Sequence, residues 1–354
     1  MGKKVLKGTG ITLALVLLAA LLLIGWLTVT EYKPEPVETM EVAPGEDGKT
    51  LAPGGSLVIL SQNTGYAGLG KEEDFFMDGG SGVRPTREEM EQNLEGIKAL
   101  LLREQADVYF LQEVDTGSSR TSGIDQRAVY HRTALPNYAS AYALNYSCDF
   151  VPYPLPPIGR VHSGVQTLSA LAVRSAERVA LPCPFSWPVS AANLKRCLLV
   201  SYVPLQDTDK ELVLVNLHLE AYDDGEGKAA QTKQLMDLLC AEYEKGNYVI
   251  AGGDFNQTFP GALEAYPIKD ASLWTPGTLE NSILPEGWQF AYDLAAPSCR
   301  LLNQPYDPAS AATQFYVIDG FILSPNIRLD VVETLDEQFT YTDHNPVKLA
   351  VTLQ

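Results

Sequence analysis

Basic residues are scarce in this sequence. Of its 354 residues, 26 are Lys or Arg and 44 are Asp or Glu, so the formal net charge at pH 7 is −18. Three of the lysines, Lys3, Lys4 and Lys7, stand at the N-terminus, and the remaining chain has 23 basic against 44 acidic residues, a net charge of −21. Generic duplex DNA binding draws most of its affinity from phosphate neutralisation, so this balance disfavours it. A local basic pocket can still bind a small phosphoester.

Cysteine and histidine are also rare. The five cysteines are odd in number and widely spaced: Cys148, Cys183, Cys197, Cys240 and Cys299. This spacing resembles neither a disulfide framework nor a metal-binding clip, and we interpret these residues as mostly structural. The chain has only four histidines, and no Cys-rich or His-rich cluster points to zinc.

Charged residues are missing altogether between Gly8 and Thr30. As a helix, the 22 residues from Thr9 to Thr30 would be about 33 Å long, enough to cross a bilayer. A cleaved signal peptide is the alternative, but its apolar core is normally about 7–15 residues and ends at a small-x-small site, where this chain has Ile24-Gly25-Trp26-Leu27. The run has no cysteine for lipid modification. We therefore predict a retained transmembrane helix over residues 9–30.

The three lysines before this helix predict its orientation. Because Lys and Arg are enriched in cytoplasmic flanks, residues 1–8 should be cytoplasmic and the chain after Glu31 extracytoplasmic, with a single crossing of the plasma membrane. Residues 31–56 contain four prolines and four glycines with few apolar residues, which predicts a semi-extended tether of up to roughly 80 Å at ~3.1 Å per residue. Residues 57–354 should form a globular domain.

Apolar runs within this domain predict an α/β architecture. Residues 57–62 and 108–111 are typical of buried strands. Between them, Thr86-Arg87-Glu88-Glu89 fits a capping box, and apolar residues at helical spacing follow from Met90 to Leu101. Strand, helix and strand in this order favour layered α/β packing.

The stretch from Val249 to Phe259 carries the clearest chemical signal. Three apolar residues predict a short buried strand, and two glycines then allow a tight turn. Asp254 and Asn256 follow two positions apart, so both can point the same way. An acid and an amide so placed can activate a water and hold a phosphoryl oxygen. Gly, Asp and Asn are also ordinary turn residues, which leaves a plain loop open at this point.

Other predicted strands also end in an acid, an amide or a histidine. These residues are Asn63, Glu113, His218 and Asp319, with Asp343-His344 directly before the last strand. Each has a structural explanation by itself, as a solvated acid, a turn-capping Asn or a hydrogen-bonded His. Their recurrence along one chain favours a shared site.

With these residues the sequence resembles the endonuclease/exonuclease/phosphatase superfamily, which includes DNase I-like nucleases, abasic-site endonucleases, inositol polyphosphate phosphatases and neutral sphingomyelinases. The resemblance runs from about Leu57 to Leu353. Its motifs are Asn63, Leu111-Gln112-Glu113-Val114-Asp115, Asn216-Leu217-His218-Leu219, Gly253-Asp254-Phe255-Asn256, Ile318-Asp319-Gly320-Phe321 and Thr342-Asp343-His344-Asn345-Pro346-Val347. Members often have Tyr or His at position 320 and Ser at position 342. The resemblance implies a DNase I-like four-layer α/β sandwich with the site at one rim.

The resemblance also implies a metal and a base, and the residue types suit both. Glu113, assisted by Asn63 and Asp343, is an all-oxygen set suited to Mg²⁺ or Mn²⁺. Asp254 would orient or deprotonate the water that attacks phosphorus.

The remaining roles implied by the resemblance concern the phosphoryl group. Asn256 and His218 would donate hydrogen bonds to its oxygens, and His344 would stabilise or protonate the transition state. Asp319 would bond the other ring nitrogen of His344 and fix its tautomer. Arg120, soon after Glu113, is a candidate phosphate ligand because a guanidinium can bind phosphate bidentately; a solvated loop arginine is the alternative.

These features predict a membrane-anchored, extracytoplasmic, metal-dependent phosphoesterase. The acidic surface and the anchor favour a small or lipid-borne phosphoester over nucleic acid. An extracellular nuclease with the same site and a non-catalytic binding domain on this fold are the alternatives, and the intact site argues against the second. The sequence indicates no protein partner, and it does not identify the substrate, because loops rather than the fold select it.

Overall fold

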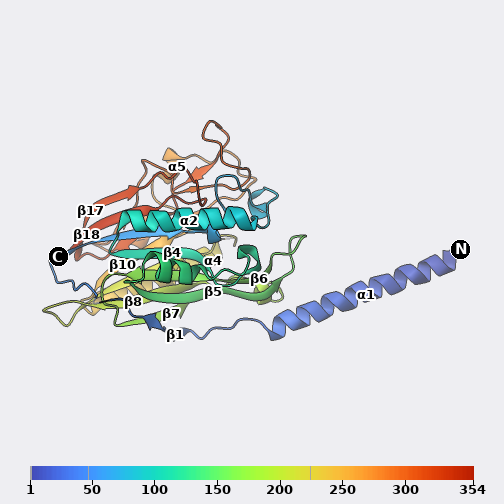
Figure 1. Cartoon of the computed structure of the whole chain (residues 1–354), viewed down its shortest axis with the longest axis horizontal. Helices are drawn as coiled ribbons and strands as arrows, with labels where there is room; N and C mark the ends of the chain where they lie inside the picture. Colours follow the sequence, from blue (N-terminus) through green and yellow to red (C-terminus); the bar gives the residue numbers. More distant parts are fainter. Residues whose placement is uncertain (1, 47, 224) are drawn as a thin grey trace.

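The computed structural model, which describes residues 2–46, 48–223 and 225–354, contains two seven-stranded β-sheets packed face to face (Figure 1). The strand order is β1-β7-β8-β9-β10-β16-β13 in the first sheet and β17-β18-β3-β4-β6-β5-β2 in the second. Helices α2 (Arg87–Glu104) and α4 (Glu226–Glu244) pack on the outer faces. The predicted four-layer α/β sandwich is therefore confirmed.

The first sheet aligns three of the predicted site residues. Its strands are β1 (Val37–Met40), β7 (Ser175–Ala180), β8 (Cys197–Pro204), β9 (Glu211–His218), β10 (Tyr248–Asp254), β13 (Gln289–Ala291) and β16 (Asp319–Leu323). β10 runs parallel to β9 and antiparallel to β16. The register places Asp254 opposite His218 on one side and opposite Asp319 on the other.

The second sheet brings the remaining motifs to the same edge. Its strands are β2 (Val42–Ala43), β3 (Ser56–Asn63), β4 (Val108–Asp115), β5 (Ala139–Val151), β6 (Gly159–Ser169), β17 (Ile327–Thr334) and β18 (Val347–Leu353). β3 and β4 are parallel, and Asn63 pairs with Gln112. β18 is antiparallel to β3, with Val347 opposite Ser61, so the loop before β18 lies beside the end of β3.

Short elements complete the chain. They are β11 (Gln257–Thr258), β12 (Gly277–Thr278), β14 (Cys299–Arg300), β15 (Phe315–Tyr316), α3 (Gln126–Ala128), α5 (Ala262–Ala265), η1 (Gly65–Ala67), η2 (Phe76–Asp78), η3 (Ser119–Thr121), η4 (Val129–Ala134), η5 (Val189–Ala192) and η6 (Asn281–Ile283). Most lie in the loops between the sheet strands.

Apolar side chains fill the space between the sheets. Ile59 and Phe110 of the second sheet meet Leu214 and Ile250 of the first, and all four are fully buried. Burial of this kind is the main favourable contribution to folding. α2 begins at the predicted capping box, in which Thr86 and Glu89 bond each other's backbone amides.

The expectation of an extended tether over residues 31–56 is wrong. β1 pairs with β7, and β2 pairs with β5, so this segment forms an edge strand on each sheet. Leu51 is buried in the core between the sheets. Strands β7 and β5 would otherwise be edge strands with unpaired backbone N–H and C=O groups, and residues 37–43 form hydrogen bonds with these groups. The Pro and Gly content of the segment does not reveal this pairing, because the pairing depends on strands elsewhere in the chain. The domain therefore begins almost directly after α1.

α1 (Gly2–Val29) projects from the domain (Figure 1). Its Gly8–Val29 part, 22 residues, is long and apolar enough to cross a membrane, a property that signal sequences share. The side chains of residues 2–7, with the three lysines, lie outside the described part. The C-terminal end of α1 contacts the domain: Trp187 Nε1 donates to Thr28 Oγ1 at 2.9 Å, and Lys195 Nζ donates to Glu31 at 2.8 Å.

Candidate active site

The eight catalytic and metal-binding residues predicted from the sequence converge at one edge of the sandwich. They are Asn63, Glu113, His218, Asp254, Asn256, Asp319, Asp343 and His344, and hydrogen bonds or short charge contacts join them into one cluster. Parallel strands β3 with β4 and β9 with β10 end here. The convergence follows from chain direction, because parallel strands present their carboxyl ends at a common edge.

Asn63 lies at the centre of the cluster. Its Nδ2 donates to Asp254 Oδ2 at 3.0 Å and to Glu113 Oε1 at 3.3 Å, and it is 3.5 Å from His344 Nε2. Its Oδ1 accepts from the backbone N–H of Gly65. In this arrangement the amide nitrogen of Asn63 faces the carboxylates, so Asn63 holds them in place and its role as an oxygen ligand for a metal stays a prediction.

Asp319 and His344 form the predicted hydrogen-bonded pair. His344 Nδ1 is 2.8 Å from Asp319 Oδ2, and Ser298 Oγ donates to the same oxygen at 2.8 Å. Burial by itself lowers the pKa of His344, but the negative charge of Asp319 outweighs it and the pKa is raised well above its usual value. The imidazole is therefore held protonated, with Nε2 directed into the cluster.

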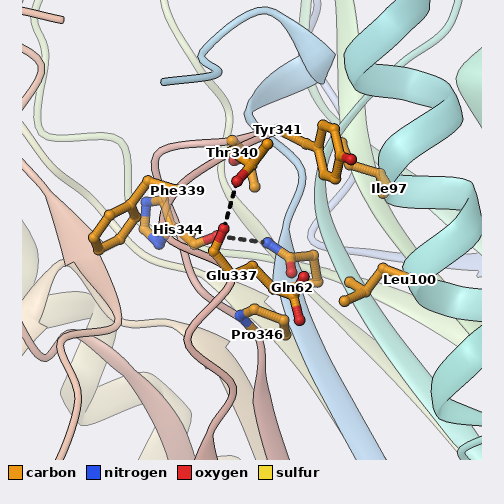
Figure 2. A pocket seen from close by; sticks show the side chains of 10 residues that line it. Gln62, Ile97, Leu100, Glu337, Phe339, Thr340, Tyr341, His344 and Pro346 are labelled. Atoms are coloured by element: carbon orange, nitrogen blue, oxygen red, sulfur yellow. Dashed lines mark hydrogen bonds between the residues drawn. The ribbon is translucent and has the colours of Figure 1, made fainter. Parts of the chain in front are cut away.

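The back of His344 closes a small pocket beside α2 (Figure 2). Ile97 and Leu100 of α2 line it, and Gln62 Nε2 donates to the main-chain oxygen of His344 at 3.1 Å. The cavity volume is about 10 Å³, room for one water. The hydrogen bond from Gln62 holds the loop that carries His344. The pocket itself is too small to admit a substrate.

Asp254 and His218 face each other across the paired strands. His218 Nε2 is 3.4 Å from Asp254 Oδ2, and Asp254 Oδ1 accepts from the backbone N–H of Asn256 at 2.8 Å. Burial, reinforced by Asp319, raises the pKa of Asp254 to about 7. Burial lowers the pKa of His218, whose Nδ1 is buried with no hydrogen-bond partner among the described residues. Asp254 is thus suited to accept a proton, and neutral His218 to hydrogen-bond a ligand.

Two site residues have left-handed backbone conformations. Glu113 has φ = 55° and Asn256 has φ = 51°, values that non-glycine residues adopt rarely and that cluster at functional sites. The pairing of β4 with β6 shifts register between Leu111 and Val114, and such a bulge redirects a side chain. The bulge turns Glu113 toward Asn63. Asn256 Nδ2 donates to the Leu219 carbonyl at 2.9 Å, which orients its amide.

Acidic and histidine groups that could bind a metal lie within the cluster. Burial raises the pKa of both Glu113 and Asp343, and Asp343 adds to the shift of Glu113. A bound cation would stabilise the charged forms of both carboxylates, which burial disfavours. Asp254, Asp319 and His344 also have ligand atoms within 4.8 Å of one another, but the Asp319–His344 bond already occupies one ring nitrogen.

A second group of candidate ligands contains a cysteine. Cys299 lies with Asp343 and His344, their ligand atoms within 4.8 Å of one another. Burial raises the pKa of the Cys299 thiol to about 12, and the thiolate is the form that binds metals. The oxygen pair Glu113 and Asp343 therefore fits a hard divalent cation better than this group fits zinc.

Arg120 does not reach into the cluster as a free phosphate ligand. Its Nε and Nη2 donate to both oxygens of buried Asp115 at 2.8 and 2.9 Å, and its guanidinium lies 3.7 Å from the centre of the Tyr66 ring. Two of its N–H groups are already bonded to Asp115, so only the remaining ones could bind a phosphate. Substrate binding by Arg120 stays a prediction.

Sequence reasoning missed several residues around the cluster. Ser298 supports Asp319 from a loop without any motif. Tyr222 donates to Asp78 Oδ1 at 3.2 Å, and burial, with added repulsion from Asp343, raises the pKa of Asp78 to about 6. These positions have no strand-end signal in the sequence. Asp78 and Tyr222 are 144 residues apart in the sequence, and only the folded chain brings them together beside the cluster.

Comparison with known proteins identifies the family. The model of the Endonuclease/Exonuclease/phosphatase family matches residues 70–344. The chain belongs to this family. Its members hydrolyse phosphoester bonds, and the matched range contains each predicted catalytic residue and two of the three predicted metal-binding residues. The third, Asn63, lies just before it. No curated protein matches the chain.

Solved structures share the fold of this family member. An endonuclease/exonuclease/phosphatase from Beutenbergia cavernae is 17% identical with a TM-score of 0.58, covering 84% of this chain and 72% of its own. A family protein from Leptotrichia buccalis is 12% identical with a TM-score of 0.54, covering 84% and 100%. Truncated TDP2 from Caenorhabditis elegans is 15% identical with a TM-score of 0.51, covering 85% and 99%. These similarities extend to the fold alone.

Proposed function

We propose that this protein is a membrane-anchored, extracytoplasmic phosphoesterase that requires Mg²⁺ or Mn²⁺. The observation that carries the proposal is the buried cluster in which Asn63 contacts Asp254, Glu113 and His344 together. A family scaffold that had lost catalysis would not need this set of buried, mutually repelling carboxylates, since each costs stability.

The geometry supports hydrolysis by an in-line water. Asp254 accepts a proton as the water oxygen attacks phosphorus and the phosphorus–ester oxygen bond breaks. Protonated His344, held by Asp319, offers Nε2–H to the phosphoryl oxygens or the leaving oxygen. Glu113 and Asp343 would hold the divalent cation, which supplies neutralisation of the non-bridging oxygens. His218 completes the contacts to the phosphoryl group.

The charge balance favours a small or lipid-borne phosphoester as the substrate. With a net charge of −21 beyond the N-terminal lysines, the domain repels a long polyanion before its phosphates reach the site. A nuclease and a non-catalytic binding domain remain as alternatives to be tested.

A substrate panel tests the proposal directly. The full chain in detergent, with Mg²⁺, should hydrolyse phospholipids or inositol phosphates faster than single- or double-stranded nucleic acid. Preferred hydrolysis of nucleic acid would establish the nuclease instead. Binding without hydrolysis of any substrate, with either Mg²⁺ or Mn²⁺, would establish the binding domain.

Topology is tested by labelling of a cysteine introduced at Leu102, which is 47% exposed on α2. Cys183 and Cys240, the two cysteines that are not buried, are first replaced by Ser. A membrane-impermeant maleimide should then label Leu102→Cys in intact cells that have no outer membrane, because we expect the domain outside. Labelling only after lysis would invert the orientation. A soluble chain beginning near Glu31 would indicate a cleaved signal peptide.

A further inference from the structure

Two uncharged loops expose large apolar side chains. Residues 151–159 and 181–194 contain no charged residue, although 20% of the chain is charged. Leu155 is 85% exposed and Tyr153 is 69% exposed in the first loop, and Trp187 is 62% exposed in the second. A soluble surface rarely concentrates apolar side chains without an interaction to make.

Both loops lie at the active-site edge of the sandwich. The first joins β5 to β6, and β6 runs antiparallel to β4 with Ser163 opposite Asp115, so its start lies just beyond the end of β4. The second precedes β8, where Leu198 pairs with Leu217 beside His218. The two exposed loops therefore lie at the same edge of the sandwich as the catalytic cluster.

The end of α1 packs against the same two loops. Leu27 is buried against Val151 and Ile158 at the base of the first loop. Trp187 of the second loop donates to Thr28 in the last turn of α1. The chain terminus at Gln354 lies at the opposite end of the sandwich (Figure 1). A bilayer crossed by α1 would thus meet the active-site edge and not the opposite edge.

We propose that the active-site edge rests on the lipid bilayer, with Tyr153, Leu155 and Trp187 inserted at the interface, and that the site takes phosphoester headgroups from the same leaflet. This inference rests on the proposed membrane anchor and phosphoesterase activity. It deepens them, because it assigns the substrate to the membrane and not to the surrounding water.

Physical chemistry favours lipid as the occupant of this surface. The hydrogen bond between Trp187 and Thr28 places the indole beside the C-terminal end of the apolar helix. This position corresponds to the membrane–water interface, where Trp is enriched in membrane proteins. Four of the seven residues from Pro152 to Ile158 are prolines. Proline has no backbone N–H, so its insertion into the membrane does not leave an N–H group without a hydrogen-bond partner. The edge strands formed by residues 37–43 hold the domain close to α1, so it cannot stand off from the membrane.

An environment-sensitive fluorophore on Leu155→Cys tests the insertion. The full chain, with Cys183 and Cys240 replaced by Ser, is labelled with nitrobenzoxadiazole and reconstituted in phosphatidylcholine vesicles. The emission should shift to the blue and be quenched by lipids with a nitroxide on the acyl chain. The matched control is the same label on Leu102→Cys near the end of α2, which leads into β4 at the opposite edge; its emission should stay that of an aqueous probe. An aqueous signal at position 155 would overturn the proposal and leave this surface to a protein partner.

The hydrolytic activity of the Leu155→Asp variant tests whether the substrate comes from the membrane. Release of phosphorylated headgroups from vesicles of phosphatidylcholine, phosphatidylethanolamine and phosphatidylglycerol should fall about tenfold, because the variant lacks an apolar side chain that inserts into the membrane interface. Hydrolysis of soluble bis(p-nitrophenyl) phosphate should not change, since Leu155 is outside the cluster. Equal losses on both substrates would overturn the proposal. A wild-type chain that inserts but hydrolyses neither substrate would refute the proposed function and leave the docking intact.

Discussion

Replacement of Asp254 by Asn should lower turnover by about 10²–10⁴-fold, the usual contribution of a positioned general base. The amide has nearly the same shape but cannot accept the proton of the attacking water. His344→Ala should cause a loss of similar size, because it removes the imidazole that Asp319 holds at 2.8 Å. Initial rates on the best substrate of the panel, at saturating Mg²⁺, measure both effects.

The fold must be followed in parallel, since both residues are buried. Asp254 accepts bonds from Asn63 Nδ2 and from the Asn256 N–H, and an amide in its place can satisfy only one of these donors with its oxygen. Circular dichroism of each variant separates a catalytic loss from unfolding. Asp237→Asn is a matched control, because Asp237 is an exposed residue of α4 whose ion pair with Lys233 is at the surface. Full activity of folded Asp254→Asn would refute the role of Asp254.

Removal of divalent cations should abolish hydrolysis, and Mg²⁺ or Mn²⁺ should restore it. Glu113→Gln should raise the Mg²⁺ concentration for half-maximal activity by at least about 10–100-fold, the range found even for residues that only support a ligand. The cation should also raise the thermal stability of the wild-type chain, because it binds the native state and relieves repulsion between Glu113 and Asp343. This second measurement does not depend on turnover.

Glu95→Gln is the control for the charge change, since Glu95 lies exposed on α2 with Lys98 as its partner. Its Mg²⁺ dependence should equal that of the wild type. If chelator-treated protein kept its activity and its melting temperature did not respond to Mg²⁺, the cation requirement would be wrong. A response to Zn²⁺ alone would point instead to the group of Cys299, Asp343 and His344.

The sequence by itself predicted the layered α/β fold and the polar residues that gather at one edge of it. Val249–Ala251 and residues 108–111 are short apolar runs typical of buried strands, and an acid follows each within three residues: Asp254 after the first and Glu113 after the second. Because strands β9 and β10 are parallel, the polar residues at their ends had to meet. The α2 capping box was equally local, since Thr86 and Glu89 lie within one turn.

Only the tertiary structure decided how residues 31–56 fold and which loops pack around the end of α1. Pro- and Gly-rich composition predicted a tether over 31–56, but the segment fills sheet edges that form elsewhere in the chain. Arg120 became the partner of Asp115, and Ser298 the support of Asp319, through contacts between loops that carry no pattern of their own. Local sequence encodes the conformation of a strand and its buried face. The packing of distant segments determines which sheet edges stay unpaired and which loops lie around α1. These features are fixed only when the whole chain has folded.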